Sequence, residues 1–167
     1  MSAYRERLLG LLGSDDPEEV LSATPGKLET LLKSLGEGGL GDRLAPGKWT
    51  ARQIFGHFAD VEQGIGFRVR QLVTCDEGHV IQAFDQDRWA APYPHLDPGG
   101  AVRAFSALRA WNLSYYRTLD SAARARAGLH PERGPESVET TVRMLAGHDR
   151  NHLAQLEGIA AARGRRG

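Results

Sequence analysis

TTVRMLAGHDRNHLAQLEGI, from Thr140 to Ile159, has the periodicity of a long amphipathic helix. Thr140 or Thr141 is expected to cap its start. One face of this helix carries six residues at spacings of three or four, namely Val142, Leu145, His148, His152, Leu156 and Ile159. Because such a stripe faces the core, both histidines should point inward. Their spacing of four residues separates the Cβ atoms by roughly 5–6 Å, so two imidazoles can bind one cation.

A third inward histidine is predicted on another helix. Thr50 and Gln53 have the spacing of a capping box at its start. The core positions that follow recur with a period near 3.6 and are Ile54, His57, Phe58, Val61, Ile65, Val69 and Leu72. Three buried imidazoles without partners would cost about 1–3 kcal/mol each, and a shared metal ion removes that cost for the coordinating nitrogens. Three nitrogen ligands also leave a coordination position open for chemistry.

Two further helices complete the expected architecture. Asp16-Pro17 and Thr24-Pro25 each have the pattern of a helix start, and an apolar stripe then ends at Gly36. Another helix is expected to begin near Gly99 or Gly100. It is expected to carry Phe105, Leu108, Asn112, Tyr115 and Leu119 at helical spacing.

No persistent strand alternation is visible between these helices. Residues 74–100 and the segment HPERGPES are expected to be loops, with Trp49 and Trp89 packed over the bundle. The pattern predicts a single all-α domain over residues 1–167, a four-helix bundle with a flexible basic tail from about 163.

Composition narrows the function. Lys and Arg together number 21, as do Asp and Glu, so no global charge attracts nucleic acid. No apolar run approaches the roughly 18 residues of a membrane span, and no export signal opens the chain. Cys75 is the only cysteine, which excludes an internal disulfide and makes a reducing cytoplasm the expected location. We therefore expect neither a nucleic-acid nor a membrane partner.

The sequence resembles the DinB/YfiT-like superfamily of metal-binding four-helix bundles. Three stretches carry the resemblance: GKWTARQIFGHFADVEQG (47–64), AFDQDRWA (83–90) and the helix of residues 140–159. It implies an up-down-down-up bundle with a long crossover loop, a nickel or zinc ion held by His57, His148 and His152, and a homodimer. Some members of the family are thiol S-transferases that use a low-molecular-weight thiol, and others are known as metal-dependent hydrolases.

The metal triad does not choose between these reactions, because an open coordination position serves hydrolysis and thiol transfer alike. We expect a metal-dependent enzyme that acts on a small molecule, as a thiol S-transferase or a hydrolase. The alternative is a non-catalytic module for metal-dependent ligand binding or stress response. Candidates to support the ligands or bind substrate are Asp60, Asp87, Arg88, Arg109 and Glu157.

Several other residues have an ordinary interpretation. Asp149 occupies the position at which the HExxH motif of metalloproteases requires glutamate. Arg68 and Arg70 are expected in ion pairs or solvent, and Cys75 in a loop. His79, His95 and His130 are expected to be solvated loop residues.

Overall fold

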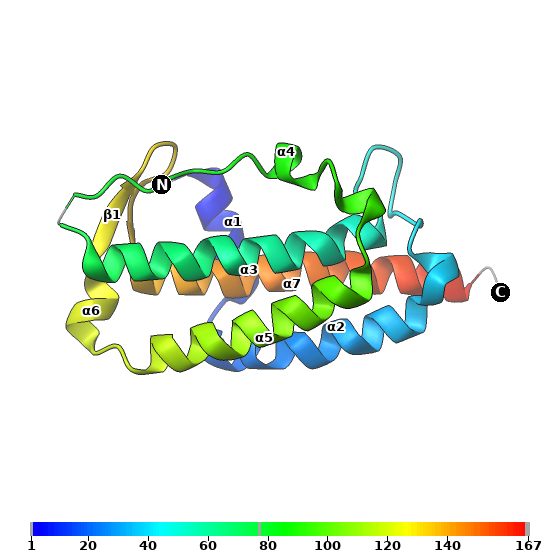
Figure 1. Ribbon diagram of the computed structural model, residues 1–167, viewed down its shortest axis with the longest axis horizontal. Helices are drawn as coiled ribbons and strands as arrows, with labels where there is room; N and C mark the ends of the chain where they lie inside the picture. Colours follow the sequence, from blue (N-terminus) through cyan, green and yellow to red (C-terminus); the bar gives the residue numbers. More distant parts are fainter. Residues whose placement is uncertain (1, 77, 166–167) are drawn as a thin grey trace.

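Four long helices form the framework of the computed structural model, which describes residues 2–76 and 78–165. They are α2 (Pro17–Gly39), α3 (Ala51–Thr74), α5 (Pro98–Arg117) and α7 (Val138–Gly164). Figure 1 shows α2 and α7 running in one direction and α3 and α5 in the other. Each helix packs against two neighbours, in the order α3, α5, α2, α7 and back to α3. The predicted four-helix bundle with up-down-down-up order is confirmed.

Side-chain caps set most of these helix starts. Asp16 caps α2 by accepting the Glu18 amide at 2.7 Å, with Pro17 at the first helical position. Thr50 and Gln53 form the predicted capping box of α3. The predicted start at Thr24 is wrong, because its hydroxyl donates to the carbonyl of Val20 inside a continuous α2.

The helix ends show a second set of differences. Gly36 interrupts α2 with φ 55° and ψ 179°, so the predicted stop is a kink after which helical turns resume. The helix α5 begins slightly earlier than expected, with Asp97 as its cap. The helix α7 is capped by Ser137 rather than by Thr140 or Thr141. It also continues to Gly164, past the residue at which the basic tail was expected to begin.

The segment HPERGPES is part of a β-hairpin, so the expected plain loop is wrong. Strand β1 (Ala127–His130) pairs antiparallel with β2 (Gly134–Ser137), and β2 leads directly into α7. The short helix α6 (Ser121–Ala125) connects α5 to this hairpin.

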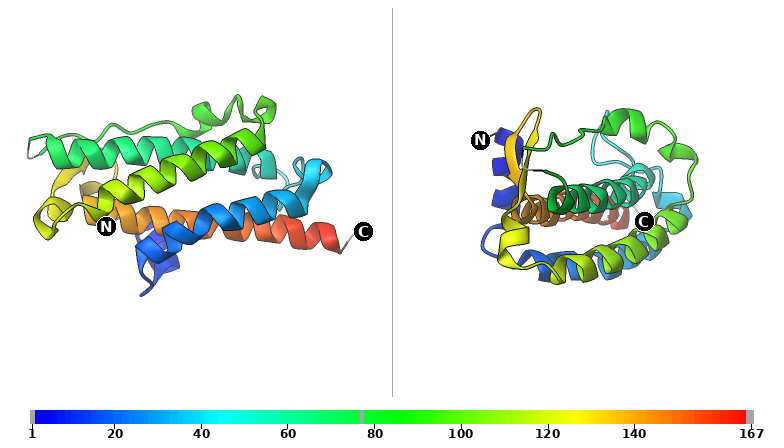
Figure 2. Two further views of the ribbon diagram at one scale, coloured as in Figure 1. Left: turned by 60° about the horizontal axis from the view of Figure 1, so that its bottom comes forward. Right: turned by 60° about the vertical axis from the view of Figure 1, so that its left-hand side comes forward.

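An N-terminal helix, α1 (Ala3–Leu12), packs on α7 and was not anticipated from the sequence. Figures 1 and 2 place it beside the hairpin, and Arg5 joins the two by donating to the carbonyls of Arg133 and Pro135 at 3.1 and 2.7 Å. Gly147 permits the contact between α1 and α7, because a Cβ there would clash with the Leu8 carbonyl.

The crossover from α3 to α5 runs along the outside of the bundle and contains α4 (Gln86–Ala90) and the 3-10 turn η1 (Tyr93–His95). Val80 forms a bridge with Leu129 of the hairpin. Tyr93 is buried against α3. Trp89 stacks on Phe84 at 4.6 Å between ring centroids, which agrees with the expected packing role. None of the described helices is long and apolar enough to cross a membrane.

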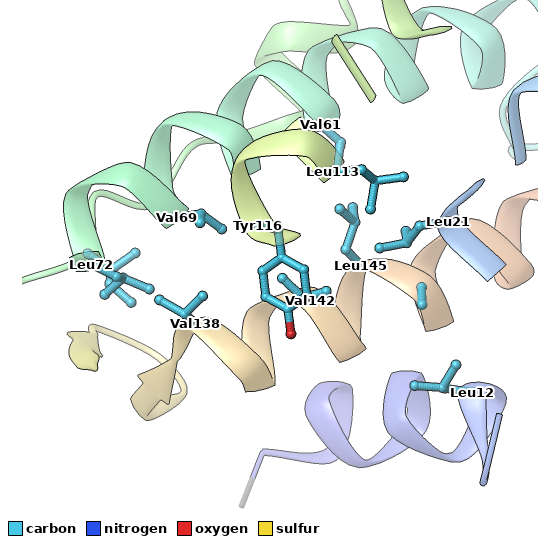
Figure 3. Close-up of a cluster of buried hydrophobic side chains, with 12 residues drawn as sticks. Leu12, Leu21, Val61, Val69, Leu72, Leu113, Tyr116, Val138, Val142 and Leu145 are labelled. Carbon is cyan, nitrogen blue, oxygen red and sulfur yellow. The ribbon is translucent and has the colours of Figure 1, made fainter. Parts of the chain in front are cut away.

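The interior consists of two apolar clusters with a polar layer between them. One cluster, shown in Figure 3, includes Leu21 of α2, Val69 of α3, Leu113 of α5 and Val142 of α7. The other includes Leu28, Phe55, Phe105 and Leu156 of the same four helices. Between these levels, α3, α5 and α7 carry buried His57, Glu62, Arg109, His148 and Asp149. These five residues form one buried polar level, and a second group of buried polar residues, Arg68 of α3 with His130 and Glu136 of the hairpin, lies outside it.

The close approach at Gly147 makes a testable prediction. Gly147→Ala should destabilise the protein by about 1–3 kcal/mol, because the methyl group displaces α1 from α7. Urea unfolding measures the loss, and hydrogen exchange should show the amides of α1 opening first.

Gly10→Ala is the matched control. Gly10 lies in α1 with no neighbour within 4 Å of an added Cβ, so this change should be neutral or stabilise by up to about 1 kcal/mol. Equal stability and equal α1 exchange in the two variants would contradict the predicted contact.

Candidate metal centre

The structure brings the three predicted histidines together from two helices. His57 comes from α3, and His148 and His152 come from successive turns of α7. One ring nitrogen of each lies within 4.8 Å of the other two, and the Nε2 atoms of His57 and His148 are 2.9 Å apart. Ligands about 2.0–2.1 Å from one ion have nitrogen atoms separated by roughly 3–4 Å. The cluster therefore has about the dimensions of a three-nitrogen metal site.

Aromatic side chains surround these imidazoles. The ring centroid of Trp49 is 4.6 Å from that of His57, and Trp49 stacks on His152 with an interplanar angle of 16°. Phe58 packs edge-on against the rings of His148 and His152, with centroid distances of 6.2 and 6.0 Å. Trp49 thus packs over the bundle as expected, but it does so against the histidines.

This environment keeps the imidazoles of His57 and His152 uncharged. Burial, followed by the nearby His148, lowers the pKa of His152 to about 3. Burial, followed by His148 and His152, also lowers the pKa of His57 far below its usual value. Neutral imidazole has a free nitrogen lone pair, which is the form that coordinates a metal.

A buried ion network of Arg109, Glu62 and Asp149 lies next to the histidine cluster. Asp149, next to His148 on α7, accepts a hydrogen bond from Arg109 Nη1 at 2.7 Å. Arg109 Nε donates to Glu62 of α3 at 2.8 Å, and the Nη1 group also donates to the Leu21 carbonyl of α2 at 2.9 Å. Burial opposes the charge on Arg109, but Asp149 and Glu62 raise its pKa above the usual value. These contacts keep Arg109 charged in the interior.

One pair of buried polar atoms fits a metal-bound arrangement. His148 Nδ1 and Asp149 Oδ1 are both buried, have no hydrogen-bond partner in the part of the chain that the structure describes, and lie 3.8 Å apart. Histidines that bind metal usually donate their second ring N–H to a carboxylate or carbonyl. Asp149 is placed to accept from His148 in this way while its other oxygen binds Arg109. The donor set therefore fits a divalent ion.

A cavity of about 760 Å³ opens beside the cluster. His57 and His148 line it, together with apolar side chains of α3 and α7 such as Val61, Ile65 and Leu145. Leu8 of α1, Phe84 of the crossover and Glu136 of β2 line other walls. This volume is large enough for a small-molecule ligand.

The structure places the other candidates away from the cavity or in ordinary roles. Asp60 accepts the Tyr93 hydroxyl at 2.7 Å. Arg109 belongs to the buried ion network and does not line the cavity. Asp87, Arg88 and Glu157 are exposed, and Arg88 forms an ion pair with Asp85. No contact between these five residues and the triad is observed among the described residues.

Of the remaining histidines and the single cysteine, one lines the cavity and the others do not. His95 is exposed, as expected, and Cys75 is a partly buried free thiol at the end of α3. His79 is partly buried in the crossover. His130 is only 2% exposed and lines the cavity, so the expectation of a solvated loop residue is wrong. Predicting that His130 is buried would have required recognising strand β1 of the hairpin in the sequence.

Comparison with known proteins agrees with this fold. The model of the DinB superfamily matches residues 21–156. The chain belongs to the DinB superfamily.

Similar proteins of this superfamily come from two bacteria. "Putative metal-dependent hydrolase OB0782" of Oceanobacillus iheyensis is 30% identical over 68% of this chain and 66% of its own length, just under two thirds. "Putative metal-dependent hydrolase OB0413" of the same organism is 27% identical over 78% of this chain and 76% of its own.

The solved structure of YfiT from Bacillus subtilis, described as "a probable metal-dependent hydrolase with an unusual four-helix bundle topology", superposes with a TM-score of 0.83. The superposition covers 89% of this chain and 86% of the YfiT chain, with 23% sequence identity. It establishes the shared fold.

The ion network makes a stability prediction for this DinB superfamily member. Arg109→Met should lower the free energy of unfolding by about 3–5 kcal/mol, because it leaves Glu62 and Asp149 as buried, uncompensated carboxylates. Urea unfolding at neutral pH measures the change.

Arg103→Met is the control on the same helix. Arg103 is exposed and pairs with Asp97 at the surface, so its loss should cost less than about 1 kcal/mol. A similar, small effect of both substitutions would show that the buried network contributes little.

The lowered histidine pKa values predict a pH dependence. Between the usual value of 6.5 and about 3, the unfolded chain binds protons that the folded His152 does not. His57 acts in the same direction. The metal-free protein should therefore lose stability as the pH falls through this window, measured by urea unfolding at a series of pH values.

The double variant His57→Phe, His152→Leu should show a shallower pH dependence than the parent protein. His95→Ala, at an exposed position, should keep the parent slope. Identical slopes in all three proteins would argue against the buried, neutral histidines.

Proposed function

We propose that this protein is a metal-dependent hydrolase of a small molecule, in which His57, His148 and His152 hold a nickel or zinc ion. The convergence of three imidazole nitrogens within 4.8 Å of one another, at the wall of a 760 Å³ cavity, carries the proposal. The names of the two Oceanobacillus relatives, both metal-dependent hydrolases, support it.

When bound, the ion would supply Lewis acidity that polarises a carbonyl and acidifies water or a thiol. The protein's own residues prepare the ligands. Burial keeps His57 and His152 unprotonated. Asp149, held by Arg109, lies 3.8 Å from His148 Nδ1 and would accept its N–H when the other ring nitrogen binds the ion. The rigid layer of α3, α5 and α7 thereby sets the positions of the imidazoles before substrate enters.

Thiol S-transfer with a low-molecular-weight thiol is the second candidate, and one observation favours it. Hydrolysis benefits from a free carboxylate or histidine as general base close to the attacking water. The carboxylates near the triad in sequence, Asp60 and Asp149, already accept hydrogen bonds from Tyr93 and Arg109. A thiol that has lost its proton to the solvent needs no such base.

Metal analysis and turnover together test the proposal. Untagged protein should contain about one nickel or zinc ion per chain by mass spectrometry, and it should hydrolyse small esters or amides. His152→Ala should lose the ion and the activity together, while His95→Ala, at an exposed position, should retain both.

The other outcomes separate the alternatives. Turnover of thiol conjugates without ester hydrolysis would identify the transferase, and saturable binding of small ligands without product would identify a binding module. Protein that contains no metal and shows unchanged activity in His152→Ala would contradict the metal-dependent mechanism. A homodimer and a cytoplasmic location remain predictions from the sequence.

A further inference from the structure

The end of the cavity away from His57 and His148 contains an arginine with unused hydrogen-bond donors. Arg68 of α3 is 6% exposed and lines the cavity. Its closest polar contact is an ion pair of 3.5 Å with Glu136, and among the described residues it makes no hydrogen bond. Its Nε is buried without a partner, and burial lowers its pKa. A guanidinium has five N–H donors, so this residue lacks acceptors.

Glu136 does not supply those acceptors, because other groups occupy its oxygens. Arg133 binds both of them, through Nε at 2.8 Å and Nη2 at 3.2 Å. The hydroxyl of Thr141 donates to the same carboxylate at 3.2 Å. Arg5 lies 3.9 Å away on the other side. Three guanidinium groups therefore surround the carboxylate of Glu136, and Glu132, which also lines the cavity, adds a second carboxylate at this end.

His130 provides a further polar group at the same end. Its Nδ1 accepts the amide N–H of Glu132 at 3.2 Å, so the neutral ring carries its proton on Nε2. The ring lines the cavity, and burial lowers its pKa, which favours this neutral form. This end of the cavity thus combines the donors of Arg68 and His130 with the carboxylates of Glu132 and Glu136, and among the described residues Arg68 makes no hydrogen bond to either carboxylate.

The spacing along α3 relates this end to the metal centre. Arg68 follows His57 by eleven residues, which is about three helical turns and roughly 16 Å along the axis on the same face. Val61 and Ile65 lie between them on that face, and Met144 and Leu145 of α7 line the cavity with them. The cavity is therefore polar at both ends and apolar in the middle.

We propose that this cavity binds an elongated small molecule whose carboxylate pairs with Arg68, whose apolar middle lies along Val61 and Ile65, and whose far end reaches the histidine cluster. A carboxylate matches the planar guanidinium and supplies the acceptors that Arg68 lacks. This inference rests on the proposed function for the identity of the reacting end. The carboxylate site itself is separate from the metal ligands and can be tested without the ion.

The test uses the full-length, metal-free protein, so that a carboxylate has no ion to bind. Calorimetric titration should show saturable binding of octanoate and about tenfold or weaker binding of octanamide, its uncharged analogue. Arg68→Met should weaken octanoate binding about tenfold or more and leave octanamide binding nearly unchanged. Met retains much of the side-chain volume, and replacing buried ionic groups by apolar ones is often tolerated.

Arg70→Met is the matched control. Arg70 lies two residues along α3, bonds to the Gly66 carbonyl and Asn112, and does not line this cavity. It should bind octanoate with parental affinity. Equal binding of octanoate and octanamide by the parent protein, no binding of either, or unchanged octanoate binding in Arg68→Met would each overturn the inference.

The two proposals fail in different ways. Absence of bound nickel or zinc would remove the proposed function while octanoate binding that depends on Arg68 persists. Metal-dependent turnover together with octanoate binding that is unchanged in Arg68→Met would leave the metal centre in place and remove the carboxylate site.

Discussion

Arg109 connects all four long helices through a single buried side chain. It extends from α5 and bonds to the Leu21 carbonyl of α2, to Glu62 of α3 and to Asp149 of α7. Buried charges are costly unless each has its partners, so the network is favourable only when the four helices meet at one register. Apolar packing above and below tolerates small shifts, whereas these charged hydrogen bonds do not. The interaction therefore sets how the helices align along the bundle axis.

The geometry of the histidine cluster follows from that alignment. Glu62 lies five residues beyond His57 on α3, and Asp149 is adjacent to His148 on α7. When Arg109 holds these two carboxylates, it brings the imidazoles of the two helices to the same level. The separation of 2.9 Å between the Nε2 atoms of His57 and His148 thus depends on a residue that touches neither. The same carboxylate, Asp149, has a second oxygen directed toward His148.

The sequence predicts the parts of this arrangement that depend on helical periodicity. The spacing of His148 and His152 and the position of His57 within an apolar stripe are sufficient to place three imidazoles in the core. The role of Arg109 was not predictable in the same way. A sequence shows that a charged residue interrupts an apolar stripe, but the partners that neutralise it lie on other helices.

Local signals also failed where tertiary contacts decide the structure. Thr24-Pro25 has the pattern of a helix start, yet α2 continues through it because the preceding turns already pack on the bundle. Pro25 lacks an amide N–H, which leaves the carbonyl of Leu21 without its helical donor, and Arg109 Nη1 donates to that carbonyl instead. The hairpin was missed because β2 is four residues long and contains Gly134 and Pro135, which favour turns. Its stability comes from Arg5 and the crossover rather than from its own sequence.

The long helices form one end of the cavity, and the hairpin and α1 form the other. The regular helices, with strong periodic patterns, position the histidines and the apolar middle. The hairpin supplies Glu136, Arg133 and His130, and α1 closes the wall beside them. Since α7 begins at the hairpin and carries both Thr141 and His148, it joins the two ends rigidly. A change in the hairpin sequence can therefore alter what the cavity binds without moving the imidazoles, because their positions are set one layer away by Arg109.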